Sequence, residues 1–413
     1  MNKSIQVFEH QAITIYPNKD GFALSKNQLD KLLAFNDQNE NKYFTGIRDG
    51  VKFNQYVGVI QIGGQTIEIL PKADKGNDYD KWRKVLLKML AVCKKVSMET
   101  VSDANLSKRQ NTLLDLYFER YIFEVQKLVH QGLVKKYRLK SGNVSALKGQ
   151  LKFAQNIQFN LVHQEQFYTQ HQTYDHEHLI NQILLKALRI LSQIVNSPSL
   201  KSNVQSLLLN FTEIKEITIT PSHFNQLKLN RKTARYKEAL QIAKMIILNY
   251  SPDIKGGQEN MIAILFDMNK LWEEYIYRML LKAGKEEYEI TDQMSKPFWE
   301  SKTIRPDIVL KHFESNKSFI IDTKWKVINN DEPSDDDLKQ MYAYNQYWEA
   351  DRSILLYPQI GTFNENFGKF HVGSVNGHHC KLGFINVLDE NGSLDLNIGS
   401  VILEKLEIDK VLQ

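Results

Sequence analysis

Two short stretches of this 413-residue chain decide the fold of its C-terminal part: RPDIVL at residues 305–310 and IIDTKWK at residues 320–326. Each joins an apolar run to a carboxylate, and turn-prone residues 314–317 lie between them. The pattern therefore predicts two strands, over residues 305–313 and 318–326. Because side chains alternate along a strand, Asp322 and Lys324 point to one face, and Asp307 reaches that face if the strands pair.

Two acids and a lysine on one face of a sheet form a candidate catalytic site. Mg²⁺ prefers carboxylate oxygens and keeps several waters that a substrate can replace. A bound Mg²⁺ polarises a phosphodiester oxygen, while Lys324 steadies or helps activate the attacking water. The alternative is a surface strand with ordinary charges, since Asp-x-Lys is common by chance. We favour the metal site because Asp322 directly follows an apolar run, where a carboxylate needs a reason.

Helical patterns flank these strands. An amphipathic helix over residues 266–281 offers Glu273 or Glu274 as a further metal ligand, and the choice stays open because adjacent helix positions point about 100° apart. A helix over residues 338–348 offers Gln340 and Tyr342, and the acidic run 331–337 before it is typical of a solvated loop with N-cap residues. With more strands at residues 354–357 and 384–387, residues 256–413 are expected to form an α/β sandwich.

The rest of the chain divides by its hydrophobic period. Residues 1–75 are expected to form a β-rich domain with a short helix at 29–35 and a hairpin, residues 57–62 and 65–70, around Gly63-Gly64. Residues 76–255 show the three-and-four spacing of helices, interrupted by a short β-like stretch at 133–153. Gly256-Gly257 marks the expected boundary. The prediction is a multidomain α+β protein.

Composition excludes several classes of protein. A hydrophobic fraction of 42% and a charged fraction of 24% are ordinary for a folded soluble chain. Two cysteines, Cys93 and Cys380, cannot form a disulfide framework. The N-terminus lacks a signal-peptide pattern, and no apolar run approaches the ~20 residues that span a bilayer. We expect a cytoplasmic protein with no membrane association.

The modest net charge of +5 conceals two basic windows. Residues 125–164 and 217–237 contain no Asp or Glu, and twelve of the 53 basic residues lie there. Such windows suit a DNA phosphate backbone, although a charge run is more often a solvated face. The candidate DNA contacts are Lys135, Lys136, Arg138, Lys140, Lys148, Arg231, Lys232 and Arg235.

Two histidine-containing clusters lack the ligand spacing of a zinc site. One contains His171, Asp175, His176 and His178, and the other is His378-His379-Cys380. We expect zinc at neither.

Several blocks resemble the McrC family, the nuclease subunits of McrBC-type modification-dependent restriction systems, which belong to the PD-(D/E)xK nuclease superfamily. The blocks are FDMNKLWEEYIYRML, RPDIVL, IIDTKWK and LKQMYAYNQYW in the C-terminal part, and YVGVIQIGGQTIEILPK, LKGQLKF and YDHEHLINQILLKAL upstream. They are spread over most of the chain, so the resemblance is to the family and not to the superfamily alone.

This resemblance implies a role for each matching residue. Asp307 and Asp322 would bind the metal, Lys324 would be the catalytic lysine, and Glu273 and Gln340 would match the helix-borne acid and the polar residue of the following helix. The implied cofactor is Mg²⁺, with Mn²⁺ as a substitute.

The resemblance also implies partners: a hexameric AAA+ GTPase of the McrB type and double-stranded, modified (methylated) DNA. In that family the N-terminal part of the nuclease subunit inserts into the motor ring and stimulates hydrolysis. The Gly63-Gly64 tip is a candidate motor contact, with an ordinary sheet hairpin as the alternative. An acidic face of the motor is the competing partner for the basic windows. We expect no nucleotide on this chain itself, because residues 361–369 lack the spacing of a phosphate-binding loop.

The sequence thus predicts the Mg²⁺-dependent endonuclease subunit of an McrBC-like complex. Two alternatives remain: a stand-alone PD-(D/E)xK nuclease in repair or another defence pathway, and a motor activator without catalysis.

Overall fold

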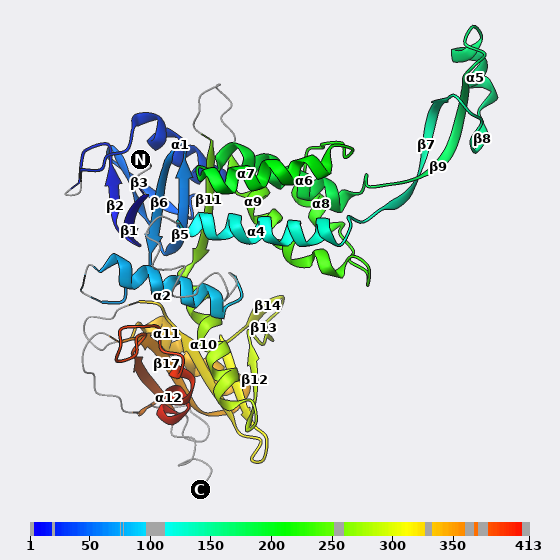
Figure 1. The fold of residues 1–413 in the computed structure, drawn as a ribbon. Coiled ribbons are helices and arrows are strands. Elements are labelled where there is room, and N and C mark those ends of the chain that lie inside the picture. Colours follow the sequence, from blue (N-terminus) through cyan, green and yellow to red (C-terminus); the bar gives the residue numbers. More distant parts are fainter. Residues whose placement is uncertain are drawn as a thin grey trace. The chain divides into compact units, whose positions relative to one another are not determined.

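The computed structural model describes residues 4–18, 21–74, 76, 78–95, 112–251, 260–326, 333–359, 367–370 and 379–406 (Figure 1). The expected boundary at Gly256-Gly257, the acids Asp331 and Glu332, and His378 lie outside these residues. The chain forms two compact units: Met1–Ile60, Gln65–Leu113 and Leu265–Gln413 make the first, and Gln61–Gly64 with Leu114–Ile264 make the second. The sequence predicts three successive domains, whereas here the two ends of the chain share one unit. Hydrophobic periodicity reports local structure and not which distant segments pack together.

The N-terminal part of the first unit is β-rich, as expected. Its elements are β1 (Ser4–Phe8), β2 (Ala12–Thr14), α1 (Lys26–Gln38), β3 (Phe44–Ile47), β4 (Gly50–Phe53), β5 (Tyr56–Ile62) and β6 (Gln65–Leu70). β1 pairs in parallel with β6, and β6 neighbours β5. A capping box starts α1, because the side chains of Ser25 and Gln28 each accept a backbone N–H of the other residue.

The predicted β5–β6 hairpin is confirmed, and hydrogen bonds join its tip to other residues of the second unit. Gly63 has φ of 58°, the left-handed conformation that glycine adopts without a steric penalty. Its N–H donates to the carbonyl of Asn260 at 2.9 Å, and the Gln61 side chain donates to the carbonyl of Ile194 at 2.8 Å. These bonds hold the hairpin tip in place within the second unit.

The second unit is mainly helical, as expected. It contains most of α4 (Leu113–His130), with α6 (Leu179–Ile194), α7 (Pro198–Leu208), α8 (Pro221–Asn225), α9 (Lys237–Leu248), the short 3-10 turns Leu209–Phe211 and Ala234–Tyr236, and the strand β10 (Tyr250–Ser251), which pairs with the start of β11 (Met261–Asp267). Buried Leu and Ile side chains of α6 face α7 and α9. The Tyr121 hydroxyl donates to the carbonyl of Leu184, which satisfies a buried polar group.

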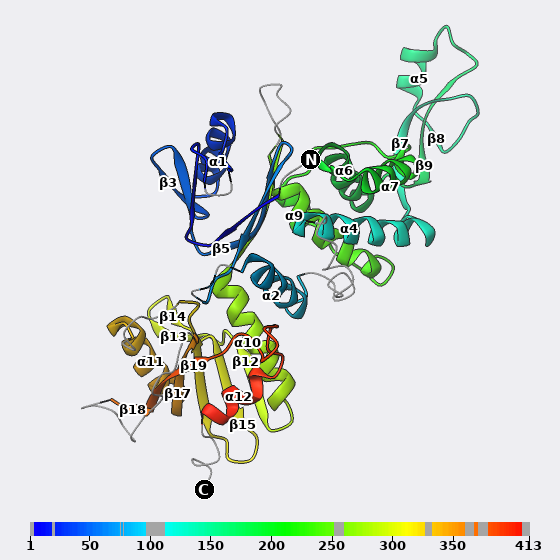
Figure 2. The same cartoon turned by 60° about the vertical axis from the view of Figure 1, so that its left-hand side comes forward.

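A β-arm extends from these helices within the second unit (Figure 2). It consists of β7 (Lys136–Val144), β8 (Gln150–Leu151), α5 (Phe153–Asn160) and β9 (Phe167–Asp175). The prediction of a short β stretch at residues 133–153 finds β7 and β8 but misses β9, which pairs antiparallel with the whole of β7. Partners such as Tyr137 and Tyr174, whose rings are 4.6 Å apart, are far apart in sequence, and a local pattern does not reveal such pairing.

The C-terminal part of the first unit contains a six-stranded mixed sheet. Its strand order is β12 (Tyr288–Asp292), β15 (Ile308–His312), β16 (Ser318–Thr323), β17 (Ala350–Pro358), β19 (His379–Ile385) and β18 (Phe367–Lys369). β12, β15 and β16 pair antiparallel, and β16, β17 and β19 pair in parallel. A separate two-stranded hairpin, β13 (Lys296–Trp299) and β14 (Lys302–Ile304), lies between β12 and β15 in sequence.

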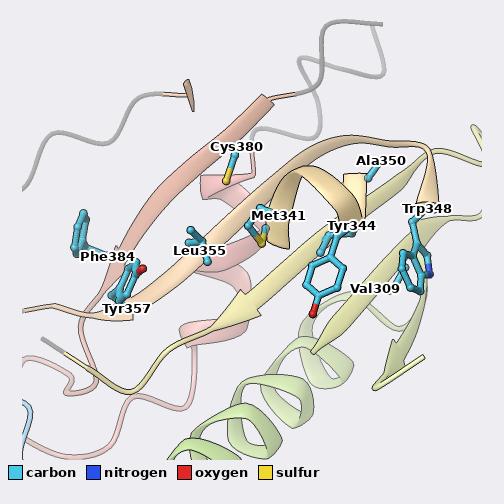
Figure 3. Close-up of a cluster of buried hydrophobic side chains, with 10 residues drawn as sticks. Val309, Met341, Tyr344, Trp348, Ala350, Leu355, Tyr357, Cys380 and Phe384 are labelled. Carbon is cyan, nitrogen blue, oxygen red and sulfur yellow. The ribbon is translucent and has the colours of Figure 1, made fainter. Parts of the chain in front are cut away.

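Helices cover both faces of this sheet (Figure 2). α11 (Asp335–Trp348) packs on β16 and β17 on one face, and α10 (Met268–Gly284) and α12 (Ile398–Lys405) pack together on the other side. α2 (Tyr79–Val92) contacts α10 and the strands β1 and β6. Beneath α11, Met341, Tyr344 and Trp348 meet Leu355 and Tyr357 of β17 in a buried cluster (Figure 3). The predicted layered α/β arrangement therefore exists, and the whole chain is a multidomain protein of mixed helices and sheets.

Candidate active site

The antiparallel pair β15–β16 brings the two predicted acids together. Ile308 pairs with Ile321, so Asp307, just before β15, lies beside Asp322 near the end of β16. The Asp307 carboxylate is fixed there because its Oδ2 accepts hydrogen bonds from the Thr323 backbone N–H at 2.7 Å and the Thr323 hydroxyl at 3.0 Å. Burial raises the pKa of Asp307 although these bonds lower it.

Asp322 is an almost completely buried carboxylate, with 1% of its surface exposed. Its Oδ2 lies 2.7 Å from the Lys324 ammonium nitrogen but has no hydrogen-bond partner of suitable geometry. Burial and the neighbouring charge of Asp307 raise the pKa of Asp322 to about 7. A buried anion without a full set of partners is costly, so this carboxylate attracts a cation.

Lys324 is held by several acceptors at once. Besides Asp322, its Nζ lies 3.6 Å from Asp337 Oδ1 and donates to Gln340 Oε1 at 3.4 Å. Burial alone would lower the pKa of Lys324, but the charges of Asp322, Asp337 and Asp307 raise it above its usual value. The side chain is therefore an ammonium at neutral pH and acts as a donor.

The choice between Glu273 and Glu274 follows from their neighbours on α10. Glu273 accepts a hydrogen bond from Gln293 at 2.7 Å, and burial followed by the charge of Asp307 raises its pKa to about 7. Glu274 forms ion pairs of 2.8 Å with Lys95 and with Arg278, and these hold its pKa low despite its burial. Glu273 is thus the acid on the side of Asp307.

Gln340 connects Lys324 to Tyr344 and, through it, to the backbone of Arg305. Its amide nitrogen donates to the Tyr344 hydroxyl at 2.6 Å, and that hydroxyl donates to the carbonyl of Arg305 at 2.7 Å. Tyr342 lies with its ring edge-on to that of Phe370, with 5.3 Å between the ring centres.

Sequence reasoning missed Asp337, Thr323 and Tyr344. Asp337 lies in the expected acidic loop, but it belongs to the first turn of α11, where Ser334 is the N-cap. A spacing of three residues from Asp337 to Gln340 places both on one helix face, and this signal was available in the sequence. Strand alternation places the Thr323 side chain on the opposite face from Asp322, yet its backbone N–H and hydroxyl both donate to Asp307.

The described residues contain no group of three His, Cys, Asp or Glu side chains arranged to hold a metal. Mg²⁺ does not need one, since it is commonly bound by one or two carboxylates and keeps its waters. Asp307 and Asp322 are hard oxygen donors. Asp322 Oδ2 has no hydrogen-bond partner, and the pKa values of Asp322 and Glu273 are raised. Both observations indicate that the site is short of positive charge. The residues present therefore fit a hard divalent cation.

The basic windows divide into exposed and internally bonded residues. Arg138 forms ion pairs with Asp175 and Glu177 at 2.9 and 2.8 Å, and Arg235 donates to the carbonyl of Gly132 at 2.6 Å. Arg235 is nevertheless exposed, as are Lys135, Lys136, Lys140, Lys148, Arg231 and Lys232.

The described side chains of the two histidine-containing clusters make local structural contacts. His171 is buried and lies 3.2 Å from the Thr169 hydroxyl, and His178 caps α6 by accepting the Ile180 N–H. Cys380 is buried in the cluster beneath α11.

Among the described residues, no helix is long and apolar enough to cross a membrane.

Comparison with known proteins identifies the relatives of this chain. The family model described as McrBC 5-methylcytosine restriction system component matches residues 51–358. The type IV methyl-directed restriction enzyme EcoKMcrBC of Escherichia coli K12 is 24% identical over 319 residues, which cover 71% of this chain and 89% of that protein.

Two solved structures are similar in fold. One is a half-complex from a tetradecameric assembly of Thermococcus gammatolerans McrB AAA+ hexamers with bound McrC, with a TM-score of 0.72 and 18% identity over 98% of this chain and 100% of that one. The other is the T. gammatolerans McrBC complex, with a TM-score of 0.50 and 19% identity over 68% of this chain and 88% of that one. The family match spans well over half of the sequence, so this chain belongs to the family of McrBC 5-methylcytosine restriction system components.

Proposed function

We propose that this chain is the endonuclease subunit of an McrBC-type restriction complex and hydrolyses DNA phosphodiesters with Mg²⁺ in a PD-(D/E)xK nuclease domain. One observation carries the proposal: Asp307, Asp322 and Lys324 converge at the end of the β15–β16 pair. An acid pair with a protonated lysine suits phosphodiester hydrolysis, in which negative charge builds on the reacting phosphate.

Each side chain has a distinct task in this proposal. Asp307 and Asp322, with Glu273, hold Mg²⁺ or its substitute Mn²⁺, and the bound ion supplies Lewis-acid polarisation and an activated water. Lys324 donates a hydrogen bond to a phosphate oxygen or to the attacking water. Gln340 and Asp337 keep the lysine in place through contacts of 3.4 and 3.6 Å with its Nζ.

The proposed partner is a hexameric AAA+ GTPase, in line with the T. gammatolerans assembly of McrB AAA+ hexamers with bound McrC. We propose that this chain stimulates the partner's hydrolysis. Nucleotide would be bound by the partner and not by this chain. The β-arm supports a protein partner because it exposes many large apolar side chains, and exposed apolar surface of this kind marks interaction sites. These side chains are Tyr137, Leu139, Leu147, Phe153, Ile157, Phe159, Leu161, Val162 and Tyr174.

The proposed substrate is double-stranded, methylated DNA, in line with the family description and the methyl-directed E. coli relative. The exposed lysines of the arm, including Lys136, Lys140 and Lys148, are proposed phosphate contacts.

The test is cleavage of methylated plasmid by the full chain with its AAA+ partner, GTP and Mg²⁺. Asp322→Asn and Lys324→Ala should each reduce cleavage by at least 100-fold while leaving partner binding and GTP turnover unchanged; roughly such losses follow removal of charge-stabilising groups. EDTA should stop cleavage, and excess Mg²⁺ should restore it. Full cleavage by either variant would contradict the assigned site. GTP stimulation without any cleavage by the wild-type chain would instead favour a motor activator.

A further inference from the structure

The β13–β14 hairpin begins and ends next to residues of the candidate active site. Just before it, the Gln293 side chain donates to Glu273 at 2.7 Å and the Gln293 N–H donates to the carbonyl of Asp307 at 2.8 Å. Just after it, the Arg305 carbonyl accepts from the Tyr344 hydroxyl. Both ends of the hairpin are therefore fixed by residues that touch the acids or the residues holding Lys324.

The hairpin is also braced along its length by α11. The Lys296 ammonium donates to the carbonyl of Tyr347 at 2.6 Å and lies 4.7 Å from the centre of the Trp348 ring. Phe298 packs against the Tyr347 ring at 5.6 Å, and the Tyr347 hydroxyl donates to the Phe298 carbonyl. The β13 strand is thus held against α11.

This braced element nevertheless exposes large aromatic surface. Trp299 is 62% exposed and Phe298 is 51% exposed. The other four tryptophans of the chain, Trp82, Trp272, Trp325 and Trp348, are buried. Phe298 and Trp299 are adjacent, so their rings form an exposed apolar patch on a hairpin strand that α11 holds in place, and such patches mark interaction sites.

Charge and position indicate which ligand covers Trp299. Residues 293–305 carry three basic side chains, Lys296, Lys302 and Arg305, and one acid, Glu300. Trp299 pairs with Lys302, which precedes Asp307 by five residues, roughly 17 Å along an extended chain. That length corresponds to about five base pairs from the site where the phosphodiester would be cut. An aromatic face beside cationic groups suits stacking on bases or insertion between base steps.

We propose that the β13–β14 hairpin contacts the DNA duplex beside the cleaved phosphate, with the Trp299 indole packed against a base or base step. The inference rests on the proposed nuclease function and adds a substrate-positioning surface to it. Trp299 contacts the substrate near the reacting atoms and takes no part in the chemistry.

The test uses the full chain with a DNA duplex, with Ca²⁺ in place of Mg²⁺ so that the DNA can be bound without being cut. Trp299 is the exposed indole, so acrylamide quenching of tryptophan fluorescence reports mainly on it. Duplex binding should protect this fluorescence, and Trp299→Ala should remove the quenchable fraction and weaken duplex binding roughly five-fold or more. Trp299→Phe keeps an aromatic face and should retain most of the affinity.

The matched control is Phe313→Ala. Phe313 is 58% exposed but follows the far end of β15, roughly 20 Å along the strand from Asp307. Its loss should leave duplex affinity and Mg²⁺-dependent cleavage unchanged. An equal loss in Phe313→Ala and Trp299→Ala would overturn the proposal.

Other outcomes separate this inference from the proposed function. The hairpin contact is wrong if Trp299→Ala binds the duplex as tightly as wild type, or if the indole stays fully quenchable in the DNA complex. In either case, cleavage by the wild-type chain would still support the nuclease function. Protection of the indole by the AAA+ partner without DNA makes the hairpin a protein contact and overturns the proposal. Failure of the wild-type chain and partner to bind or cut DNA contradicts the proposed function and this inference together.

Discussion

Glu9, next to the end of β1, accepts a hydrogen bond of 2.7 Å from the indole nitrogen of Trp325, the residue after Lys324. The same carboxylate oxygen accepts the Lys72 N–H at 3.0 Å, beyond the end of β6. Segments 316 residues apart in sequence are thus joined within the first unit at a buried carboxylate. Its other oxygen has no hydrogen-bond partner.

The first prediction concerns stability and pH. Burial raises the pKa of Glu9 from about 4.5 to about 7, so the folded state holds a proton that the unfolded state releases. The contribution of the Glu9 carboxyl to the free energy of unfolding is fully present below pH 4.5, and it is lost as the pH rises towards 7 and above. A shift of this size is worth about 3 kcal/mol. Glu9→Gln should therefore raise the melting temperature at pH 8 and change it little at pH 4.5, as thermal unfolding would show. A variant that is less stable than wild type at pH 8 would contradict this.

The second prediction separates two adjacent acids. Glu273→Gln should lower Mg²⁺-dependent cleavage at least ten-fold, because Glu273 lies on the side of Asp307. Glu274→Gln should leave cleavage near wild type and lower stability by up to about 1 kcal/mol, since the partly exposed Glu274 pairs with Lys95 and Arg278. Cleavage rates and melting temperatures of both variants check the assignment, and the reverse pattern would place Glu274 in the site.

The third prediction concerns the positioning of Lys324. Asp337→Asn should reduce the cleavage rate about ten-fold without changing the amount of folded protein, because Asp337 helps hold the ammonium. The neighbouring Asp336 is the control: its side chain is 95% exposed, against 13% for Asp337. Asp336→Asn should cut DNA like wild type. If Asp337→Asn alters only the Mg²⁺ concentration needed and not the maximal rate, a positioning role for Asp337 is wrong.

The fourth prediction tests the metal site without cleavage. A cation that binds only the folded chain raises its stability, by about 2.7 kcal/mol at one hundred times its dissociation constant. Mg²⁺ should therefore raise the melting temperature of the wild-type chain and of Asp336→Asn. It should have no such effect on Asp322→Asn, which lacks one of the three proposed ligand carboxylates, Asp307, Asp322 and Glu273. An unchanged Mg²⁺ effect in Asp322→Asn would move the metal elsewhere.

Local sequence patterns were enough to predict the main local elements and to single out Asp307, Asp322 and Lys324. Alternation and turn residues predict β15, β16 and the β5–β6 hairpin, and the apolar run before Asp322 makes that carboxylate conspicuous. Predicted strand ends were less accurate: β15 begins at Ile308 and β16 ends at Thr323, so Asp307 and Lys324 lie just outside the strands.

The residues that surround Asp307, Asp322 and Lys324 become clear only in the folded structure. It separated Glu273 from Glu274 through the distant partners Gln293 and Lys95, and it brought Asp337 to Lys324. It also paired β9 with β7 and placed Glu9 on Trp325. The physical reason is common to all of these: periodicity and turn chemistry act between neighbours in sequence, whereas hydrogen bonds, burial and charge act between neighbours in space.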